Sequence, residues 1–136
     1  PLEKAKIVKE GNDITIVSYG AQMKEAGEAS VILKKEGINV ELIDLRTIYP
    51  YDREMILNSV KKTGRFLVIH EGPQSCGVGG ELISLVANEA FVYLSAPPTR
   101  LAGFDTVVPL PKGEHNYLIT TEHIAETVKE LVNYEP

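Results

Sequence analysis

Three side chains capable of acid–base or nucleophilic chemistry, His70, Glu71 and Cys76, lie close together in the sequence. A histidine beside a cysteine can generate a thiolate nucleophile, and His or Glu can act as a general acid or base. The stretch continues into the glycine-rich run Gly77–Gly80, where backbone N–H groups at the start of a helix could receive a phosphate. The residues therefore leave open a Cys76–His70 nucleophile and a phosphate- or nucleotide-binding loop.

The spacing of the glycines does not complete a known phosphate motif. Gly77 and Gly79 begin a dinucleotide fingerprint, but Leu82 occupies the position of the third glycine, and no Lys-Ser/Thr pair follows as in a P-loop. The alternative is a tight turn that lets a helix pack closely against a sheet. For His70 the alternatives are a residue that faces a cleft and a hydrogen-bonded histidine at an interface.

Charged pairs elsewhere suggest structural roles. His115 follows Glu114 and His123 follows Glu122, but this spacing matches no standard zinc site, so we expect a solvated surface. At the end of a predicted strand, Asp44 precedes Arg46 by two positions. We interpret these two residues as an ion pair that anchors the connection, and such pairs also occur in subunit contacts.

The elements that must position these residues alternate between strand and helix. Unbroken apolar runs predict buried strands, and apolar residues at helical spacing predict helices with one buried face. The pattern predicts an α/β fold with a mostly parallel sheet covered by helices on both faces, so His70, Glu71 and Cys76 would lie at the carboxyl edge of the sheet. The predicted strands are residues 14–17, 40–45, 66–69 and 99–104, and the predicted helices are residues 21–36, a helix capped by Asp52 and ended by Gly64, residues 81–90, and a last helix capped by Thr120 or Thr121.

Two other segments are less regular in sequence. Phe91–Leu94 is apolar and is expected to be a short strand or extended segment, and residues 105–117, which contain Pro109, are expected to form a long loop. Residues 1–12 are polar and end in a turn signal, which predicts a linker that enters a domain of residues 13–136. The chain begins with Pro1 instead of Met, so we expect it to be a piece of a longer protein.

Composition excludes several classes of protein. The 136 residues, 43% apolar and 24% charged, predict one globular domain. A net charge of -5 offers no basic surface for nucleic acid or an anionic membrane, and no apolar run approaches the roughly 20 residues of a membrane helix. With a single cysteine the chain cannot form an intrachain disulfide or a multi-cysteine metal site.

A series of motifs in order along the chain carries a family resemblance. It comprises Asp44-Leu-Arg-Thr-Ile-Tyr-Pro50, His70-Glu71 with the glycine run and Glu81, Leu94-Ser-Ala-Pro97, Arg100, Gly103-Phe104-Asp105-Thr106 and Pro109. The series resembles the C-terminal domain of transketolase-type thiamine diphosphate enzymes. Within that group it is most similar to the beta subunit of the decarboxylating component of 2-oxo acid dehydrogenase complexes.

The resemblance implies a three-layer αβα sandwich whose five-stranded sheet has four parallel strands and one antiparallel strand. It also implies a missing N-terminal pyrimidine-binding domain, with thiamine diphosphate and magnesium held between that domain and an alpha subunit. The parent reaction would be decarboxylation of a 2-oxo acid and reductive acylation of a lipoyl group. No catalytic, cofactor-binding or metal residue is expected within the fragment, which would be inactive alone.

The resemblance further implies three partners in an α2β2 assembly: a second beta subunit, the alpha subunit and the dihydrolipoyl acyltransferase. We expect Asp44, Arg46, His70 and Glu71 at the interface. Acyltransferase docking would use Phe91, Ser95 and Tyr134, and Ser95 stands where pyruvate-type enzymes carry an acid, which argues against an ionic contact.

The stretch from His70 to Pro73 is more similar to branched-chain or acetoin enzymes, so we expect 2-oxoisovalerate as the substrate, with pyruvate second. The implied location is the cytoplasm of a prokaryote or the mitochondrial matrix of a eukaryote.

Overall fold

The computed structural model describes residues 1–107 and 111–136, so Pro109 lies outside the described residues. Their five-stranded sheet has the order β1-β3-β2-β4-β5, and only the β1–β3 pair is antiparallel. This confirms the predicted fold class. The elements are β1 (Lys6–Lys9), β2 (Ile14–Ser18), α1 (Gln22–Lys35), β3 (Val40–Asp44), α2 (Arg53–Thr63), β4 (Phe66–Pro73), α3 (Val78–Glu89), the 3-10 turn η1 (Phe91–Tyr93), β5 (Thr99–Gly103), α4 (Glu114–Tyr117) and α5 (Thr121–Val132).

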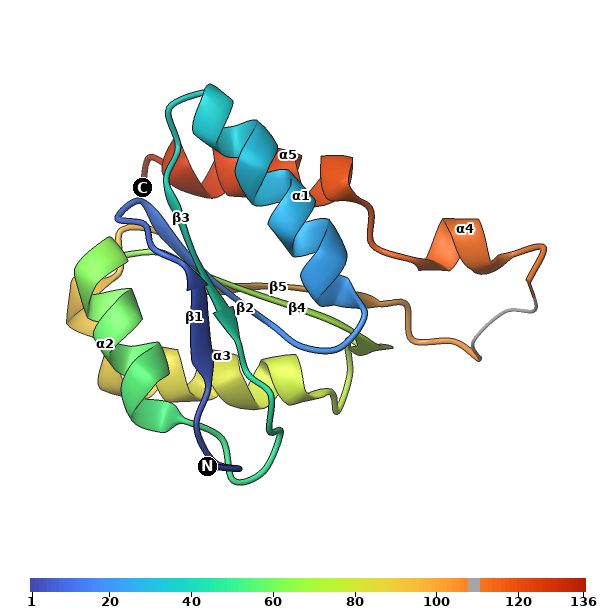
Figure 1. Cartoon of the computed structure of the whole chain (residues 1–136), viewed down its shortest axis with the longest axis horizontal. Helices are drawn as coiled ribbons and strands as arrows, with labels where there is room; N and C mark the ends of the chain where they lie inside the picture. The colour runs from blue at the N-terminus through green and yellow to red at the C-terminus, as the bar shows by residue number, and fades with distance from the viewer. Residues whose placement is uncertain (108–110) are drawn as a thin grey trace.

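Helices cover the sheet on both faces (Figure 1). Helices α1 and α5 pack together on one face, and α2 and α3 cover the other. Each face has its own apolar core: Leu33, Leu67 and Ile124 belong to the first, and Phe66 and Val86 to the second. The sheet is therefore the middle of three layers, as expected.

The central strands β2 and β4 are buried along the segments that the apolar runs predicted. All five residues of β2 are buried, and β4 is buried from Phe66 to His70. The two strands pair in parallel, with Thr15 opposite Phe66 and Ser18 opposite Ile69. Because both strands run to the same edge, Tyr19, which follows β2, comes close to Glu71 in the last part of β4.

The helix boundaries follow local capping chemistry. Asp52 caps α2 by accepting a hydrogen bond at Oδ1 from the backbone N–H of Met55, over 3.2 Å, and Gly64 ends the helix in the left-handed conformation. Thr120 caps α5 in the same way through the N–H of His123, over 3.1 Å. These caps confirm the sequence-based boundaries of both helices.

Residues 1–12 are not simply a linker, because they contribute strand β1. This strand pairs with β3, with Lys6 opposite Asp44 and Ile7 opposite Ile43. The apolar pattern did not predict this strand, because β1 is the edge of the sheet and its side chains are exposed or only half-buried. Lysines on an edge strand also discourage pairing with another chain.

Phe91–Leu94 is not a strand, contrary to the expectation. Successive hydrogen bonds from Tyr93 N to Ala90 O and from Leu94 N to Phe91 O wind it into the 3-10 turn η1. The apolar side chains of Phe91 and Val92 are 71% and 85% exposed, so they do not join the core. The predicted loop of residues 105–117 also contains a short helix, α4, which projects away from the sheet in Figure 1.

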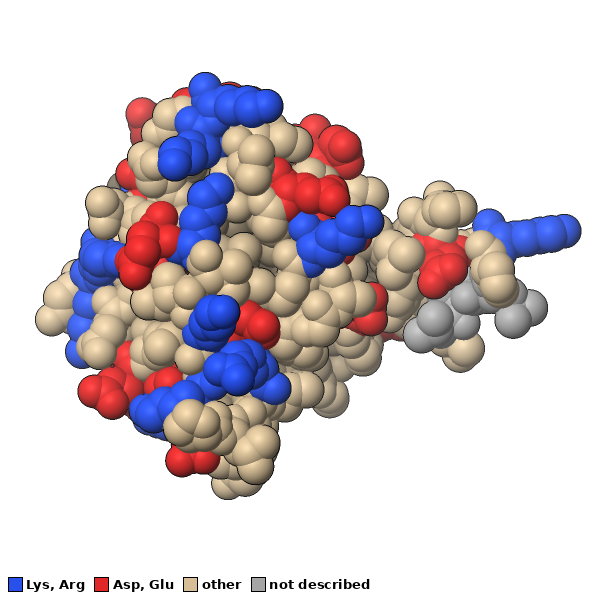
Figure 2. Space-filling model, viewed as in Figure 1, with Lys and Arg blue, Asp and Glu red and all other residues tan. Residues whose placement is uncertain are grey.

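Charged side chains of both signs are interspersed over the face shown in Figure 2, with no single basic patch on it. None of the helices in residues 1–107 and 111–136 is long and apolar enough to cross a bilayer.

Candidate functional site

His70 is the last buried residue of β4, which continues through the exposed Glu71 to Pro73. Its side chain is 1% exposed, and its Nε2 accepts a hydrogen bond from the backbone N–H of Gly79 over 3.0 Å. Tyr19, at the end of β2, stacks on the imidazole with ring centroids 6.3 Å apart. His70 therefore lies beneath the glycine-rich loop and links β4 to the first turn of α3.

The glycines in this loop are required by close packing around His70. A Cβ atom at Gly79 would lie 2.5 Å from His70 Nε2, and one at Gly77 would lie 2.8 Å from His70 Cε1 and would also collide with the carbonyl of Pro73. The backbone N–H of Gly79 is bonded to His70, and that of Gly80 to the carbonyl of Gly77. This arrangement favours the tight packing turn over a phosphate-binding loop.

The surroundings of His70 favour the neutral imidazole. Burial lowers the pKa of His70, the nearby carbonyl of Gly72 acts in the opposite direction, and the positive charge of Arg100 lowers the pKa further. Nδ1 is buried without a hydrogen-bond partner among the described residues. On the neighbouring strand, burial raises the pKa of Tyr19, and the negative charge of Glu71 adds to this shift.

Cys76 and His70 do not form a nucleophilic pair in this structure. Cys76 is exposed in the loop with φ 58°, and the only hydrogen bond to a His70 ring nitrogen among the described residues comes from Gly79. Glu71 is exposed beside them, and its backbone carbonyl accepts a hydrogen bond from the hydroxyl of Tyr117 over 3.0 Å. The three residues share one edge of the sheet, but they do not assemble a catalytic group.

Asp44 and Arg46 interact, although not as the predicted ion pair. Oδ1 of Asp44 accepts a hydrogen bond from the backbone N–H of Arg46 over 3.1 Å, and no ion pair between their side chains is found in the described part of the chain. The carboxylate binds the backbone of Arg46 instead of its side chain, because Arg46 adopts φ 61° and turns its N–H toward Asp44. The Arg46 side chain remains exposed.

The three residues expected to dock a partner lie together in one groove. Phe91, Ser95 and Tyr134 line an apolar depression of about 740 Å³ between η1 and the end of α5. Phe91 is 71% and Tyr134 44% exposed, whereas Ser95 is anchored by its backbone N–H to the carbonyl of Gly64 over 2.8 Å. The other apolar residues that line this docking groove include Val92, Leu94, Pro97 and Pro136.

The remaining histidines lie on α4 and α5, and His123 lines a small pocket together with Gln74 and Tyr117. His115 is exposed in α4, and His123 is exposed in the first turn of α5. Within residues 1–107 and 111–136, no three His, Cys, Asp or Glu side chains are placed to hold a metal ion.

Three contacts at the carboxyl edge were not predicted from the sequence. They are the stacking of Tyr19 on His70, the bond from Tyr117 to Glu71, and the bonds from Ser75 N and Oγ to the Asp105 carboxylate, over 2.8 and 2.5 Å. The Ser75 bonds lower the pKa of Asp105. Only the strand order could have indicated these contacts, because each joins elements far apart in the sequence.

Comparisons with known proteins identify the family. The chain matches the family model "Transketolase, C-terminal domain" over residues 3–124. It is 48% identical over 136 residues to the pyruvate dehydrogenase E1 component subunit beta of Acholeplasma laidlawii, covering 100% of this chain and 42% of that protein. It is 41% identical over 134 residues to the 2-oxoisovalerate dehydrogenase subunit beta 2, mitochondrial, of Arabidopsis thaliana, covering 98% of this chain and 37% of that protein.

Solved structures agree on the fold. A split-gene transketolase, described as an inactive beta4 tetramer, superposes with a TM-score of 0.85 at 24% identity, covering 100% of this chain and 44% of that one. The chain thus spans less than half the length of the relatives that it matches. Since the family model matches most of its residues, the chain belongs to the transketolase C-terminal domain family.

Proposed function

We propose that this chain is the C-terminal domain of the beta subunit of a 2-oxo acid dehydrogenase component that decarboxylates its substrate and acylates a lipoyl group. The observation that carries the proposal is the 48% identity over the whole chain to a pyruvate dehydrogenase E1 component subunit beta. A Mycoplasma pneumoniae subunit of the same name is 46% identical over 138 residues. In this proposal residues 1–12 connect the domain to a pyrimidine-binding domain that precedes it.

Thiamine diphosphate and magnesium belong to the proposed enzyme, but the described residues do not fit them. Magnesium needs several oxygen ligands, and no cluster of three acidic or histidine side chains is present in the described ranges. The amides of Gly79 and Gly80, which could hold a diphosphate, are bonded within the chain. We therefore assign cofactor binding and catalysis to the rest of the enzyme.

The docking groove supports a role in holding the dihydrolipoyl acyltransferase. An exposed apolar depression of about 740 Å³ has the size of a binding site, and exposed aromatic side chains commonly anchor protein interfaces. Ser95 supplies no charge there, so the contact we propose is apolar. The expected binding residues remain Phe91, Ser95 and Tyr134.

The carboxyl edge is the surface that we assign to the second beta subunit and to the alpha subunit. Arg46 and Glu71 are exposed there and Asp44 is half-buried, whereas His70 supports the loop from below. Tyr49, 87% exposed, adds a large apolar surface to the same edge. This arrangement favours a role for Arg46 and Glu71 in direct contacts and an indirect role for His70.

We infer pyruvate as the first candidate substrate, ahead of the 2-oxoisovalerate that the sequence motifs led us to expect. The relatives at 48% and 46% identity are named for pyruvate, and the one at 41% is named for 2-oxoisovalerate. The similarity of His70–Pro73 to branched-chain enzymes favours the second. We place the protein in the cytoplasm of a prokaryote or in the mitochondrial matrix of a eukaryote.

The experiment is reconstitution of the full-length subunit with its alpha subunit and acyltransferase, followed by assays on pyruvate and 2-oxoisovalerate. Turnover of a 2-oxo acid that depends on thiamine diphosphate is the expected result. Turnover of neither acid by a folded, cofactor-loaded assembly would contradict the proposal.

Docking is tested separately by measuring acyltransferase binding. Phe91→Ala should weaken binding by about tenfold or more, as expected for an aromatic anchor. Val31→Ala shortens an apolar side chain that is 53% exposed on α1, outside the groove and away from the carboxyl edge, and should leave binding unchanged. Equal effects of the two substitutions would contradict docking at the groove.

A further inference from the structure

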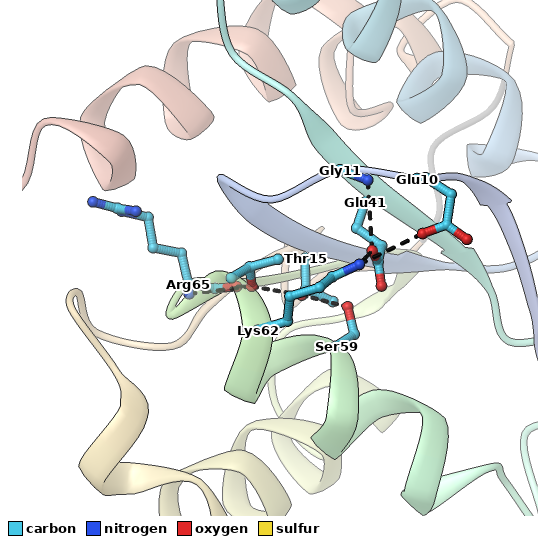
Figure 3. A network of polar contacts seen from close by, with 8 residues as sticks. Glu10, Gly11, Thr15, Glu41, Ser59, Lys62 and Arg65 are labelled. Carbon is cyan, nitrogen blue, oxygen red and sulfur yellow. Dashed lines mark hydrogen bonds and ion pairs between the residues drawn. The ribbon is translucent and has the colours of Figure 1, made fainter.

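Polar side chains interrupt the apolar core between the sheet and α2. Thr15 of β2 shares hydrogen bonds with Ser59 and Thr63 of α2, over 2.6 and 2.8 Å. Glu41 of β3 lies opposite Thr15 in the sheet, and Lys62 of α2 reaches it with its ammonium group (Figure 3). The hydroxyl contacts and the Glu41–Lys62 pair lie side by side in one polar cluster, in which all members except Lys62 are buried.

Glu41 is the unusual member of this cluster, because its side chain is only 2% exposed. Its Oε2 atom accepts hydrogen bonds from Lys62 and from the backbone N–H of Gly11, the latter over 3.5 Å. The chain needs glycine at position 11, since a Cβ there would collide with the backbone of Val40. The hydrogen bonds of the Glu41 carboxylate among the described residues all go to Oε2, and Oε1 is not among the fully buried atoms that lack a partner, so Oε1 is an accessible acceptor.

Stability alone does not explain this arrangement. A buried carboxylate loses its hydration, and a buried ion pair is often no more stabilising than apolar side chains of the same volume. The hydrogen bond to Glu41 raises the pKa of Lys62. Nζ of Lys62 also lies 3.5 Å from Oε2 of Glu10, so one ammonium group interacts with two carboxylates. Lys62 therefore divides its charge between the buried Glu41 and the exposed Glu10.

Glu41 also lines a cavity between β1 and α2. The cavity has a volume of about 420 Å³, which lies within the range of small-molecule sites. Its apolar lining is Ile7 and Met55, and its polar lining includes Ser59 and Asn58. The cavity thus offers an apolar surface beside a buried carboxylate with an accessible acceptor atom.

The charged residues that line the cavity indicate which class of ligand fits it. Glu41, Asp52 and Glu54 line it together with Lys4 and Lys62, which leaves one negative charge in excess. No three acidic side chains of the described residues converge to hold a metal ion. A cation that donates hydrogen bonds and carries apolar surface satisfies both the charge and the apolar lining.

We propose that this cavity binds a small organic cation, an ammonium or guanidinium group on a short apolar chain. The charged group lies against Glu41, and the chain lies along Ile7 and Met55. The site is separate from the docking groove and does not depend on the function proposed above.

The test measures binding of isopentylammonium to the full-length protein by calorimetry, with isopentyl alcohol as the neutral probe of the same shape. The ammonium probe should bind saturably and at least about tenfold more tightly than the alcohol, because only the cation interacts with the Glu41 charge. No saturable binding of the ammonium probe, or equal binding of the two probes, overturns the proposal.

Two substitutions locate the site. Glu41→Gln should weaken binding by about tenfold or more, and Met55→Trp should block the cavity without removing a charge. Met55 is half-buried on α2, so this second variant tests the site even if Glu41→Gln does not fold. Glu36→Gln, which breaks the surface pair of Glu36 with Lys129, is the control and should bind normally. Normal binding by folded Met55→Trp overturns the proposal.

Discussion

Nε2 of His70 accepts a hydrogen bond from the backbone N–H of Gly79 over 3.0 Å, which ties the end of β4 to the start of α3. The bond requires an unprotonated Nε2, so the neutral imidazole carries its proton on Nδ1. If Nε2 gained a proton, two donors would face each other inside a buried contact. The packing of the loop around His70 therefore depends on the charge state of this side chain.

We therefore predict that acid lowers the free energy of unfolding of the domain, because His70 becomes protonated. Burial holds the pKa of His70 below its unfolded value of about 6.5, so at mildly acidic pH the unfolded chain binds the extra proton first. The contribution is complete above about pH 6.5 and is lost as the pH falls through the folded pKa, by at most about 1.4 kcal/mol per pH unit. Urea unfolding at pH 7 and pH 5 measures this loss.

The matched control is the exposed His123. Substituting His70 by Gln should reduce the pH dependence between pH 7 and 5 and lower the free energy of unfolding at pH 7, because Gly79 loses a well-placed acceptor. Substituting the exposed His123 by Gln removes no side-chain hydrogen bond found among the described residues and should leave the free energy of unfolding at pH 7 near that of the wild type. Identical pH profiles for wild type and the His70 variant would contradict the role of His70.

We predict that adding a single methyl group at Gly79 strongly lowers the free energy of unfolding. Gly79→Ala would place Cβ 2.5 Å from His70 Nε2 and 3.4 Å from Val68 Cγ1, in a contact that cannot open easily. We expect a loss of about 1–3 kcal/mol in the free energy of unfolding, measured by urea denaturation.

Gly27→Ala is the control for this substitution. Gly27 lies inside α1, and nothing lies within 4 Å of its added Cβ, so Ala should stabilise the domain by about 0.5–1 kcal/mol through helix propensity. If both substitutions shifted stability in the same direction, close packing at Gly79 would not be the cause.

The elements that could be predicted from the sequence are those that depend on interactions between residues close together in the chain. The buried strands β2 and β4 were visible as apolar runs, and the caps Asp52 and Thr120 marked the helices that follow them. The edge strand β1 was missed, because an exposed strand rich in lysine has no apolar signature. The expectation of a strand at Phe91–Leu94 was wrong for the opposite reason, since the apolar side chains of Phe91 and Val92 line a surface groove instead of the core.

The candidate site was predictable only as a location. Strand order placed His70, Glu71 and Cys76 at one edge of the sheet, and sequence reasoning found that edge. The hydrogen bond from Gly79 to His70 and the stacking of Tyr19 depend on tertiary geometry that no spacing shows. Glu41 went unnoticed because a single acid in a strand carries no sign that it will be buried beside Lys62.

A last prediction concerns how β1 is held to the domain. Asp52 caps α2 through Oδ1, and its Oδ2 accepts a hydrogen bond from the buried backbone N–H of Ala5 over 3.2 Å, just before β1. Asp52→Ala should therefore cost more than an ordinary cap, about 2 kcal/mol or above in the free energy of unfolding, because it leaves two N–H groups unpaired. Thr120→Ala removes a cap that serves only α5 and should cost about 1 kcal/mol. Hydrogen exchange separates the two effects: the Asp52 variant should lose protection in β1 as well as in the first turn of α2, and unchanged protection of β1 would show that Asp52 does not hold the strand.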